Sequence, residues 1–218
     1  MITKSQLAKL IDHTNLNPEA TTQHIRLLCD EALKYQVASV CVSPTRVGLA
    51  VGQLDGNIPV CTVIGFPSGA VVTDAKCEEL REAKLQGAQE FDMVINIGAL
   101  KDGDVDAVYG EIARLKEIAG PLPLKTILET AVLSDEEIVA ACEAAVRAGA
   151  DFVKTSTGFH KAGGATVHAV RLMKETVGPR VGVKASGGIR TFDAAQQMVD
   201  AGASRIGLSQ TAAVLADL

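Results

Sequence analysis

The chain has 218 residues, of which 47% are hydrophobic and 22% charged, and this composition can form a well-packed core. The formal net charge of −5, with no basic run to offset it, argues against a nucleic-acid-binding protein. No apolar run reaches transmembrane length, and the first residues lack the pattern of a signal peptide. We therefore predict a cytoplasmic protein with neither a nucleic-acid nor a membrane partner.

The first elements are a short helix, a weak strand and a long helix. Residues 4–11 have the pattern of a short amphipathic helix, and Ile11-Asp-His-Thr14 that of a weak strand. Asn17-Pro18-Glu19 predicts a helix start, with Asn17 as the N-cap and proline in the first turn. This helix is expected to run to about Lys34.

Strand and helix signals then alternate to the end of the chain. Strands are predicted over residues 37–42, 60–65, around Asp92, over 124–129, up to Lys154, and over 181–184 and 204–208. Helices are predicted after Ser43-Pro44 and over residues 73–87, 104–119, 134–149, up to about 176, and 191–202. Ser134 and Glu137 form a capping-box pattern, and Thr191 is a second N-cap.

Eight alternations of this kind predict an α/β protein with a (β/α)8 TIM barrel, preceded by a short extra N-terminal helix. The alternative is an open, doubly wound sheet. No linker or low-complexity stretch interrupts the pattern, so we expect residues 1–218 to form a single TIM-barrel domain.

Three strands share a layout that places particular side chains at one depth. Each follows a Gly-Ala pair, and the fifth residue after that glycine is Asp92, Lys154 or Gly207. Alternate strands of a barrel fill the same interior layer, so these positions are expected to lie together, with Gly207 leaving room. A lysine freed of its charge by its surroundings can act as a nucleophile. The alternative is that Lys154 reaches solvent or pairs with an acid for structural reasons.

Lys184 ends the strand next to that of Lys154. A second ammonium disfavours the charged form of the first, so Lys184 is expected to help free the Lys154 amine, while Asp92 balances the charge. A buried Lys-Asp-Lys network that serves only the fold is the competing interpretation. Lys125 begins its strand, so for it a peripheral ion pair and a role in the site are equally plausible. Asp12, Thr14, Asn96, Glu129 and Thr130 are further residues that could line the pocket.

Two glycine-containing turns predict a phosphate site. Ser186-Gly187-Gly188 follows the seventh strand, and Gly207-Leu-Ser209 follows the eighth. Backbone N–H groups in such turns bind anions, and the loops after these two strands are where this fold usually holds phosphate. The alternative is that the glycines only make tight turns.

The cysteines and histidines do not predict a metal site. The five cysteines lie in apolar segments without Cys-x-x-Cys spacing, which predicts buried free thiols in a reducing compartment. No histidine, aspartate and glutamate set has metal-ligand spacing, so we expect neither a metal nor a cofactor.

Several segments together resemble deoxyribose-phosphate aldolase. They are Ile11-Asp-His-Thr-Asn-Leu, Ile64-Gly-Phe-Pro-Ser-Gly, Phe91-Asp-Met-Val-Ile-Asn, Leu128-Glu-Thr, Asp151-Phe-Val-Lys-Thr-Ser-Thr-Gly-Phe and Val183-Lys-Ala-Ser-Gly-Gly-Ile-Arg. The resemblance spans residues 7–209. It implies a metal-free class I aldolase that cleaves 2-deoxy-D-ribose 5-phosphate to acetaldehyde and D-glyceraldehyde 3-phosphate in deoxyribonucleotide catabolism. It also implies small sugar-phosphate and aldehyde substrates and, as in many members, a homodimer.

By position, the resemblance implies that Lys154 forms the Schiff base, that Lys184 assists it, and that Asp92 is the acid/base acting through a water. Substrate and phosphate contacts are expected from Thr157, Gly158, Ser186, Gly187, Gly188, Gly207 and Ser209.

Two features depart from the family pattern. The family usually carries Gly-Thr-Ser-Ser-Gly after the last strand, where this chain has Gly207-Leu-Ser-Gln-Thr211, so the phosphate segment has one hydroxyl and one glycine fewer. The family also often has a tail that ends in tyrosine, whereas the last residues of this sequence are Ala216-Asp-Leu218.

The residues alone leave two other functions open. One is a different lysine-dependent barrel aldolase or transaldolase, and the other is a sugar-phosphate-binding barrel without catalysis.

Overall fold

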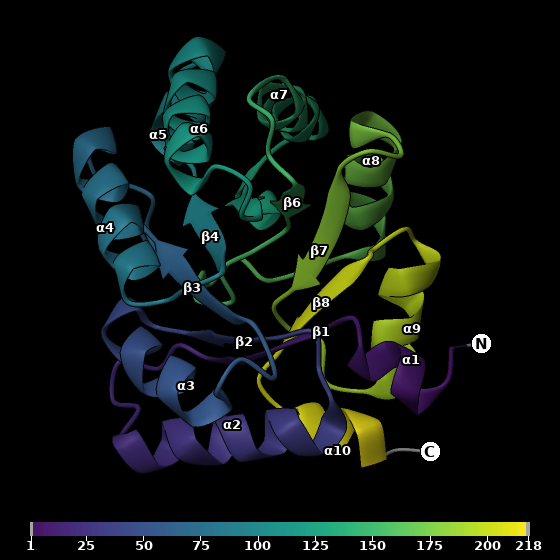
Figure 1. Cartoon of the computed structure of the whole chain (residues 1–218). Helices are drawn as coiled ribbons and strands as arrows, with labels where there is room; N and C mark the ends of the chain where they lie inside the picture. The colour runs from purple at the N-terminus through teal and green to yellow at the C-terminus, as the bar shows by residue number, and fades with distance from the viewer. Residues whose placement is uncertain (1, 217–218) are drawn as a thin grey trace.

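The computed structural model describes residues 2–216 and contains a closed barrel of parallel strands (Figure 1). Neighbouring strands follow in chain order, and β8 pairs with β1 to complete the ring. The predicted TIM barrel is therefore confirmed, and the open sheet is wrong. The strands are β1 (Ile11–Asn15), β2 (Ser39–Val42), β3 (Val60–Ile64), β4 (Glu90–Val94), β5 (Leu124–Ile127), β6 (Phe152–Lys154), β7 (Gly182–Ser186) and β8 (Arg205–Leu208).

Helices surround the barrel, and the short N-terminal helix α1 (Lys4–Ala8) precedes it as predicted (Figure 1). The other α-helices are α2 (Thr22–Tyr35), α3 (Val47–Leu54), α4 (Thr73–Leu85), α5 (Ile97–Lys101), α6 (Val105–Ala119), α7 (Asp135–Arg147), α8 (Val167–Val177), α9 (Phe192–Asp200) and α10 (Thr211–Ala216). Two 3₁₀ turns, η1 (Pro44–Arg46) and η2 (Thr130–Val132), follow β2 and β5. No helix within residues 2–216 is both long and apolar enough to cross a membrane.

Two helix starts differ from the sequence prediction. Asn17 does not cap α2, because Thr21 and His24 form a reciprocal capping box there, with the His24 N–H donating to Thr21 Oγ1 at 3.3 Å. Helix α5 has no counterpart among the predicted elements; Asn96 caps it by accepting the Ala99 N–H at 3.1 Å. The predicted caps at Ser134 and Thr191 are confirmed.

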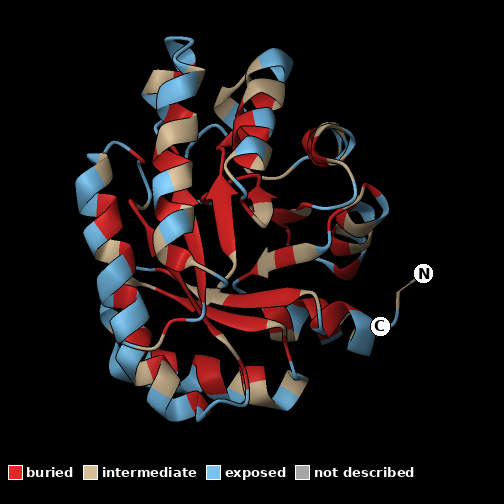
Figure 2. Ribbon diagram, turned by 45° about the horizontal axis from the view of Figure 1, so that its top comes forward, coloured by how far each residue is buried: buried red, intermediate tan, exposed pale blue. Residues whose placement is uncertain are grey.

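The strands are buried and the helices expose only their outer faces (Figure 2). Apolar side chains fill the layer between strands and helices, which suits the near-continuous apolar character of parallel strands. The barrel interior is different, because charged side chains occupy it: Asp12, Glu90, Asp92, Lys125, Lys154 and Lys184 are all buried there. Burying so many charges is costly, so their arrangement points to a function.

Candidate active site

Lys154 is the last residue of β6 and lies beside Lys184. Phe152 and Val153 are strand formers, whereas Thr155-Ser-Thr-Gly158 continues as loop, so the strand ends with the lysine. In the parallel register Lys154 pairs with Lys184 of β7. The predicted neighbourhood of the two lysines is therefore present, and both are buried, at 3% and 1% exposed.

Asp92 of β4 connects three lysines. Its Oδ2 accepts hydrogen bonds from Lys154 Nζ at 2.8 Å and Lys184 Nζ at 2.6 Å. Its Oδ1 accepts from Lys125 Nζ at 2.9 Å and from the Cys61 thiol at 3.2 Å. One carboxylate thus links the end of β6 with β5 and β7.

Lys125 is not peripheral. Although it lies near the start of β5, its side chain is fully buried inside the barrel and contacts Glu90 at 2.6 Å as well as Asp92. The sequence could not decide between the two interpretations, because the position of a lysine in its strand does not show how far its side chain extends across the barrel. Its neighbour in the network, Arg205 of β8, contacts Asp12 at 2.6 Å and Glu90 at 3.1 Å.

Asp12 is a second carboxylate in contact with Lys184, and sequence reasoning gave it no such role. Lys184 Nζ donates to Asp12 Oδ2, and Ser39 donates to Asp12 Oδ1 at 2.7 Å. The interior network therefore has four cationic side chains (Lys125, Lys154, Lys184 and Arg205) and three carboxylates (Asp12, Glu90 and Asp92). When one lysine loses its proton, the charges balance.

Neighbouring carboxylates favour the charged form of two of the lysines. Burial lowers the pKa of Lys184, but Asp12 and Asp92 outweigh this and raise it above its ordinary value. Burial also lowers the pKa of Lys125, and Asp92 is the first of the groups that raise it well above the usual range. Both therefore stay charged. Lys154 contacts Asp92 at 2.8 Å and is the lysine of this network that lines the pocket.

The carboxylates stay ionised in this setting. Burial alone raises the pKa of Asp92, yet Lys125, Lys154 and Lys184 hold it well below its ordinary value. Burial likewise raises the pKa of Asp12, and Lys184, Lys125 and Arg205 reverse this to a lowered value. In this structure Asp92 is thus an ionised acceptor of the hydrogen bonds from the neighbouring ammonium groups.

The cysteines are free and buried, as predicted. Two sets of potential metal ligands (Cys41, Cys61 and Asp92; Asp12, Cys61 and Glu90) have donor atoms within 4.8 Å of one another. However, the Lys125 ammonium already contacts Cys61 at 3.4 Å, together with Asp92 and Glu90. A cation therefore sits at the centre of these donors, and a second one would meet strong repulsion.

Gly207 leaves room for Lys184, in agreement with the expected gap. A Cβ atom built on Gly207 would lie 3.4 Å from Lys184 Cε and 2.8 Å from Ser186 Cβ. Gly207 is also register-paired with Asp12 on one side and Ser186 on the other. A side chain here would clash with Ser186 and would lie in van der Waals contact with Lys184.

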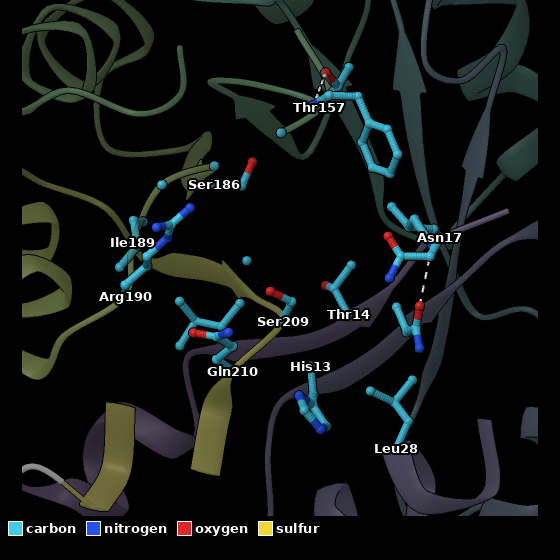
Figure 3. A pocket seen from close by; sticks show the side chains of 18 of the residues that line it. His13, Thr14, Asn17, Leu28, Thr157, Ser186, Ile189, Arg190, Ser209 and Gln210 are labelled. Carbon is cyan, nitrogen blue, oxygen red and sulfur yellow. Dashed lines mark hydrogen bonds between the residues drawn. The ribbon is translucent and has the colours of Figure 1, made fainter. Parts of the chain in front are cut away.

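A pocket of about 740 Å³ opens at this end of the barrel (Figure 3). Lys154 is one of its lining residues. In Figure 3, Ser186, Arg190, Ser209 and Gln210 lie on one side of the pocket, and Asn17 and Leu28 lie on the other. The lining includes every predicted substrate and phosphate residue, namely Thr157, Gly158, Ser186, Gly187, Gly188, Gly207 and Ser209.

The turn after β7 is built on two glycines that line the pocket. Gly187 and Gly188 both have positive φ, of 86° and 81°, a conformation that favours glycine, and neither carries a side chain that would cover its backbone N–H. Arg190, which sequence reasoning did not assign, joins the same lining and adds a positive charge. The sequence signal that could have identified it is the Ser-Gly-Gly-Ile-Arg segment, in which an arginine closely follows the glycine turn.

Other expectations divide between the pocket and the core. Thr14 and His13 line the pocket, although His13 is 1% exposed and also bonds Glu31 and Thr211. Asn96 caps α5 and is not among the lining residues, and neither are the buried residues Glu129 and Thr130.

The hydroxyl of Ser186 donates to the Ser156 carbonyl at 2.6 Å. Of the C-terminal residues compared with the family tail, 217 and 218 lie outside the described part of the chain.

Comparisons with known proteins agree with this geometry. The model of the DeoC/LacD family aldolases matches residues 6–212. The chain is 55% identical to deoxyribose-phosphate aldolase 1 of Cutibacterium acnes over 212 residues, which cover 97% of each chain. It is 53% identical to the deoxyribose-phosphate aldolase of Kocuria rhizophila over 219 residues, with 100% and 99% covered. Among solved structures, the tetrameric deoxyribose phosphate aldolase of Aeropyrum pernix superposes with a TM-score of 0.92 at 33% identity, covering 98% of this chain and 91% of that one.

Proposed function

The chain belongs to the DeoC/LacD aldolase family, and we propose that it is a class I aldolase that cleaves 2-deoxy-D-ribose 5-phosphate to acetaldehyde and D-glyceraldehyde 3-phosphate, and joins them in reverse. The observation that carries this proposal is the pairing of Lys154 and Lys184 on one oxygen of Asp92, beneath a pocket with a glycine turn at its side. The reaction belongs to deoxyribonucleotide catabolism.

In the proposed first step, neutral Lys154 attacks the aldehyde carbon of the open-chain sugar. A C–N bond forms, the carbonyl oxygen takes up two protons, one of them released by the amine nitrogen, and leaves as water, and a protonated imine remains. Lys184 and Asp92 move the protons of this step, because their side chains share a hydrogen bond and Asp92 also contacts Lys154. The charge count of the interior network supports one neutral lysine, since three cations then match the three carboxylates, and Lys154 is the lysine that lines the pocket.

In the second step, the imine nitrogen accepts the electron pair of the bond between C2 and C3. The C3 hydroxyl loses its proton and becomes the aldehyde of glyceraldehyde 3-phosphate, while the two-carbon fragment stays on Lys154 as an enamine. Protonation at C2 and hydrolysis then release acetaldehyde and restore the lysine. Asp92, acting through a water, and Lys184 serve as the acid/base pair.

In the proposed binding mode, the phosphate sits against Ser186-Gly187-Gly188 and Gly207 to Ser209. Their place at the C-terminal ends of β7 and β8 supports this, as do the positive φ angles of Gly187 and Gly188. Arg190 adds a charge-assisted contact. Gly158 and Thr157 close the pocket from the loop after β6. Assembly as a homodimer remains a prediction, to be tested by sedimentation.

The direct test is cleavage of purified deoxyribose 5-phosphate, followed through the acetaldehyde released. We expect turnover by the wild-type chain and none by Lys154→Met. A chain that binds the sugar phosphate without releasing acetaldehyde would support the non-catalytic barrel. Cleavage of other sugar phosphates in preference to this one would support a different lysine-dependent aldolase.

A further inference from the structure

Glu129 combines a strained backbone with a buried carboxylate next to the proposed site. It has φ 61°, in the left-handed region that disfavours residues with a side chain. The other non-glycine residues with positive φ among residues 2–216, Gln36 and Asp55, are exposed C-caps of α2 and α3. Glu129 is 1% exposed and closes no helix C-terminus. A strained residue that the surrounding structure holds in place calls for a functional explanation.

Glu129 lies in a bulge, just past the end of β5, where the chain pairs with Lys154 and Thr155. Leu128 N–H donates to the Lys154 carbonyl at 2.9 Å, and Thr130 N–H donates to the Thr155 carbonyl, also at 2.9 Å. Two residues on the β5 side therefore match one on the β6 side, and Glu129 is the extra residue. Bulges of this kind redirect a side chain. Here the redirected group is the carboxylate, which turns toward the loop that follows Lys154.

The Glu129 carboxylate accepts hydrogen bonds from two groups of Thr157, its hydroxyl and its backbone N–H. Thr157 Oγ1 donates to Glu129 Oε2 at 2.5 Å, and the Thr157 N–H lies 3.3 Å from the same oxygen and 3.4 Å from Oε1. Since the hydroxyl proton is used in this bond, the Thr157 oxygen has lone pairs left to accept, and it accepts the Phe159 N–H at 3.1 Å. The hydroxyl of Thr157 thus braces a turn over Gly158, which has φ 82°.

The turn reaches both the phosphate side and the mouth of the pocket. A Cβ on Gly158 would lie 3.8 Å from the Gly187 Cα, so the two glycine turns touch. Phe159 packs edge to face on Phe66, with ring centroids 5.2 Å apart. Movement of the Thr157 to Phe159 turn would therefore disturb the pocket at both places, without any contact to the network beneath Lys154.

We infer that Glu129 is a positioning residue: its carboxylate fixes the Thr157-Gly158-Phe159 turn so that this turn binds the phosphorylated end of the substrate. This inference extends the proposed function, because it assigns substrate affinity to a residue that lines no part of the pocket. Glu129 is not a lining residue of the pocket and its carboxylate is bonded to Thr157, so we expect it to act on binding and not on imine chemistry.

The experiment uses a substitution that removes the carboxylate and the strain together. Glu129→Gly suits a φ of 61°, so it deletes the contact without adding a conformational penalty. We expect its KM for deoxyribose 5-phosphate to rise roughly 10- to 100-fold, the range for loss of a hydrogen bond to a charged group. Its kcat and its KM for unphosphorylated deoxyribose should stay within about threefold of wild type. Glu129→Gln keeps an acceptor oxygen and should recover most of the loss.

Two further measurements separate positioning from general damage. Thr157→Val removes the other half of the contact, so the double variant with Glu129→Gly should be no worse than the poorer single variant. Amide hydrogen exchange at Thr157 and Phe159 should accelerate in Glu129→Gly while exchange in β6 and β7 is unchanged. This readout needs no catalysis, so it decides the role of Glu129 even if the aldolase assignment fails. Unchanged exchange, additive losses, or equal KM increases for both sugars would overturn the inference.

Discussion

Lys154 and Lys184 donate hydrogen bonds to the same oxygen of Asp92, at 2.8 and 2.6 Å, from register-matched positions on β6 and β7. The shared acceptor makes the two lysines one unit. A change in the charge of either is felt by the other through this carboxylate, and the proposed chemistry depends on that coupling.

Replacing the shared acceptor should therefore remove most of the activity. We expect Asp92→Asn to lose roughly 10²- to 10⁴-fold in kcat, the range for loss of an acid-base group. Steady-state cleavage of deoxyribose 5-phosphate measures it. Glu90→Gln is the matched control, since it neutralises a buried carboxylate of the same strand that contacts Lys125 and Arg205 instead of Lys154. Similar losses in both variants would attribute the effect to the network as a whole.

Removing the second ammonium should shift the reaction to higher pH. In Lys184→Leu the charged form of Lys154 loses a like-charged neighbour and is favoured, so the neutral amine becomes available only at higher pH. The rate of imine formation with acetaldehyde, measured against pH, reports this shift. Lys184→Arg keeps the charge and should retain the wild-type pH dependence. An unchanged profile in Lys184→Leu would show that the two lysines are not coupled.

Placing a carboxylate at the phosphate turn should weaken binding of the phosphorylated substrate selectively. We expect Gly187→Asp to raise KM for deoxyribose 5-phosphate far more than for deoxyribose, because the new negative charge repels the phosphate. Gly103→Asp is the control, since Gly103 also has a positive φ, of 79°, but lies exposed with no atom near its Cβ direction. Equal losses on both sugars in Gly187→Asp would indicate damage to the fold.

The contact of Lys154 with Asp92 and its neighbour Lys184 could be predicted from the sequence, but the contacts of Lys125 and Asp12 could not. The spacing after Gly87, Gly149 and Gly202 placed Asp92, Lys154 and Gly207 at one depth because strand period and barrel layering follow simple rules. The contacts of the Lys125 side chain depend on how far that side chain extends across the barrel, and residue spacing does not determine this.

The start of α2 and the backbone conformation of Glu129 are two further features that differ from the sequence prediction or were absent from it. The helix α2 begins at Thr22 and not near Asn17, because a capping box with His24 at its third position outcompetes an Asn-Pro start. The left-handed conformation of Glu129 could not be foreseen, since nothing in Leu-Glu-Thr distinguishes a bulge from a regular strand end. Strain of this kind is imposed by tertiary contacts.

The buried carboxylates predict how stability depends on pH. Asp12 and Asp92 have folded-state pKa values below their ordinary value, so the unfolded chain binds their protons more readily. Their contribution is complete above the unfolded pKa of about 3.9 and is lost as pH falls from there through the folded values. Urea unfolding between about pH 5 and 2 should therefore show a steady loss of unfolding free energy, with proton uptake on unfolding. A flat profile would contradict the assigned charge states.

The central claim is that Lys154, and no other lysine of the network, forms the covalent intermediate. Incubation with acetaldehyde, reduction with borohydride and peptide mass mapping test it directly. We predict one ethylated lysine, at position 154, and no adduct in Lys154→Met. An adduct on Lys184 or Lys125, or none in the wild-type chain, would contradict the account.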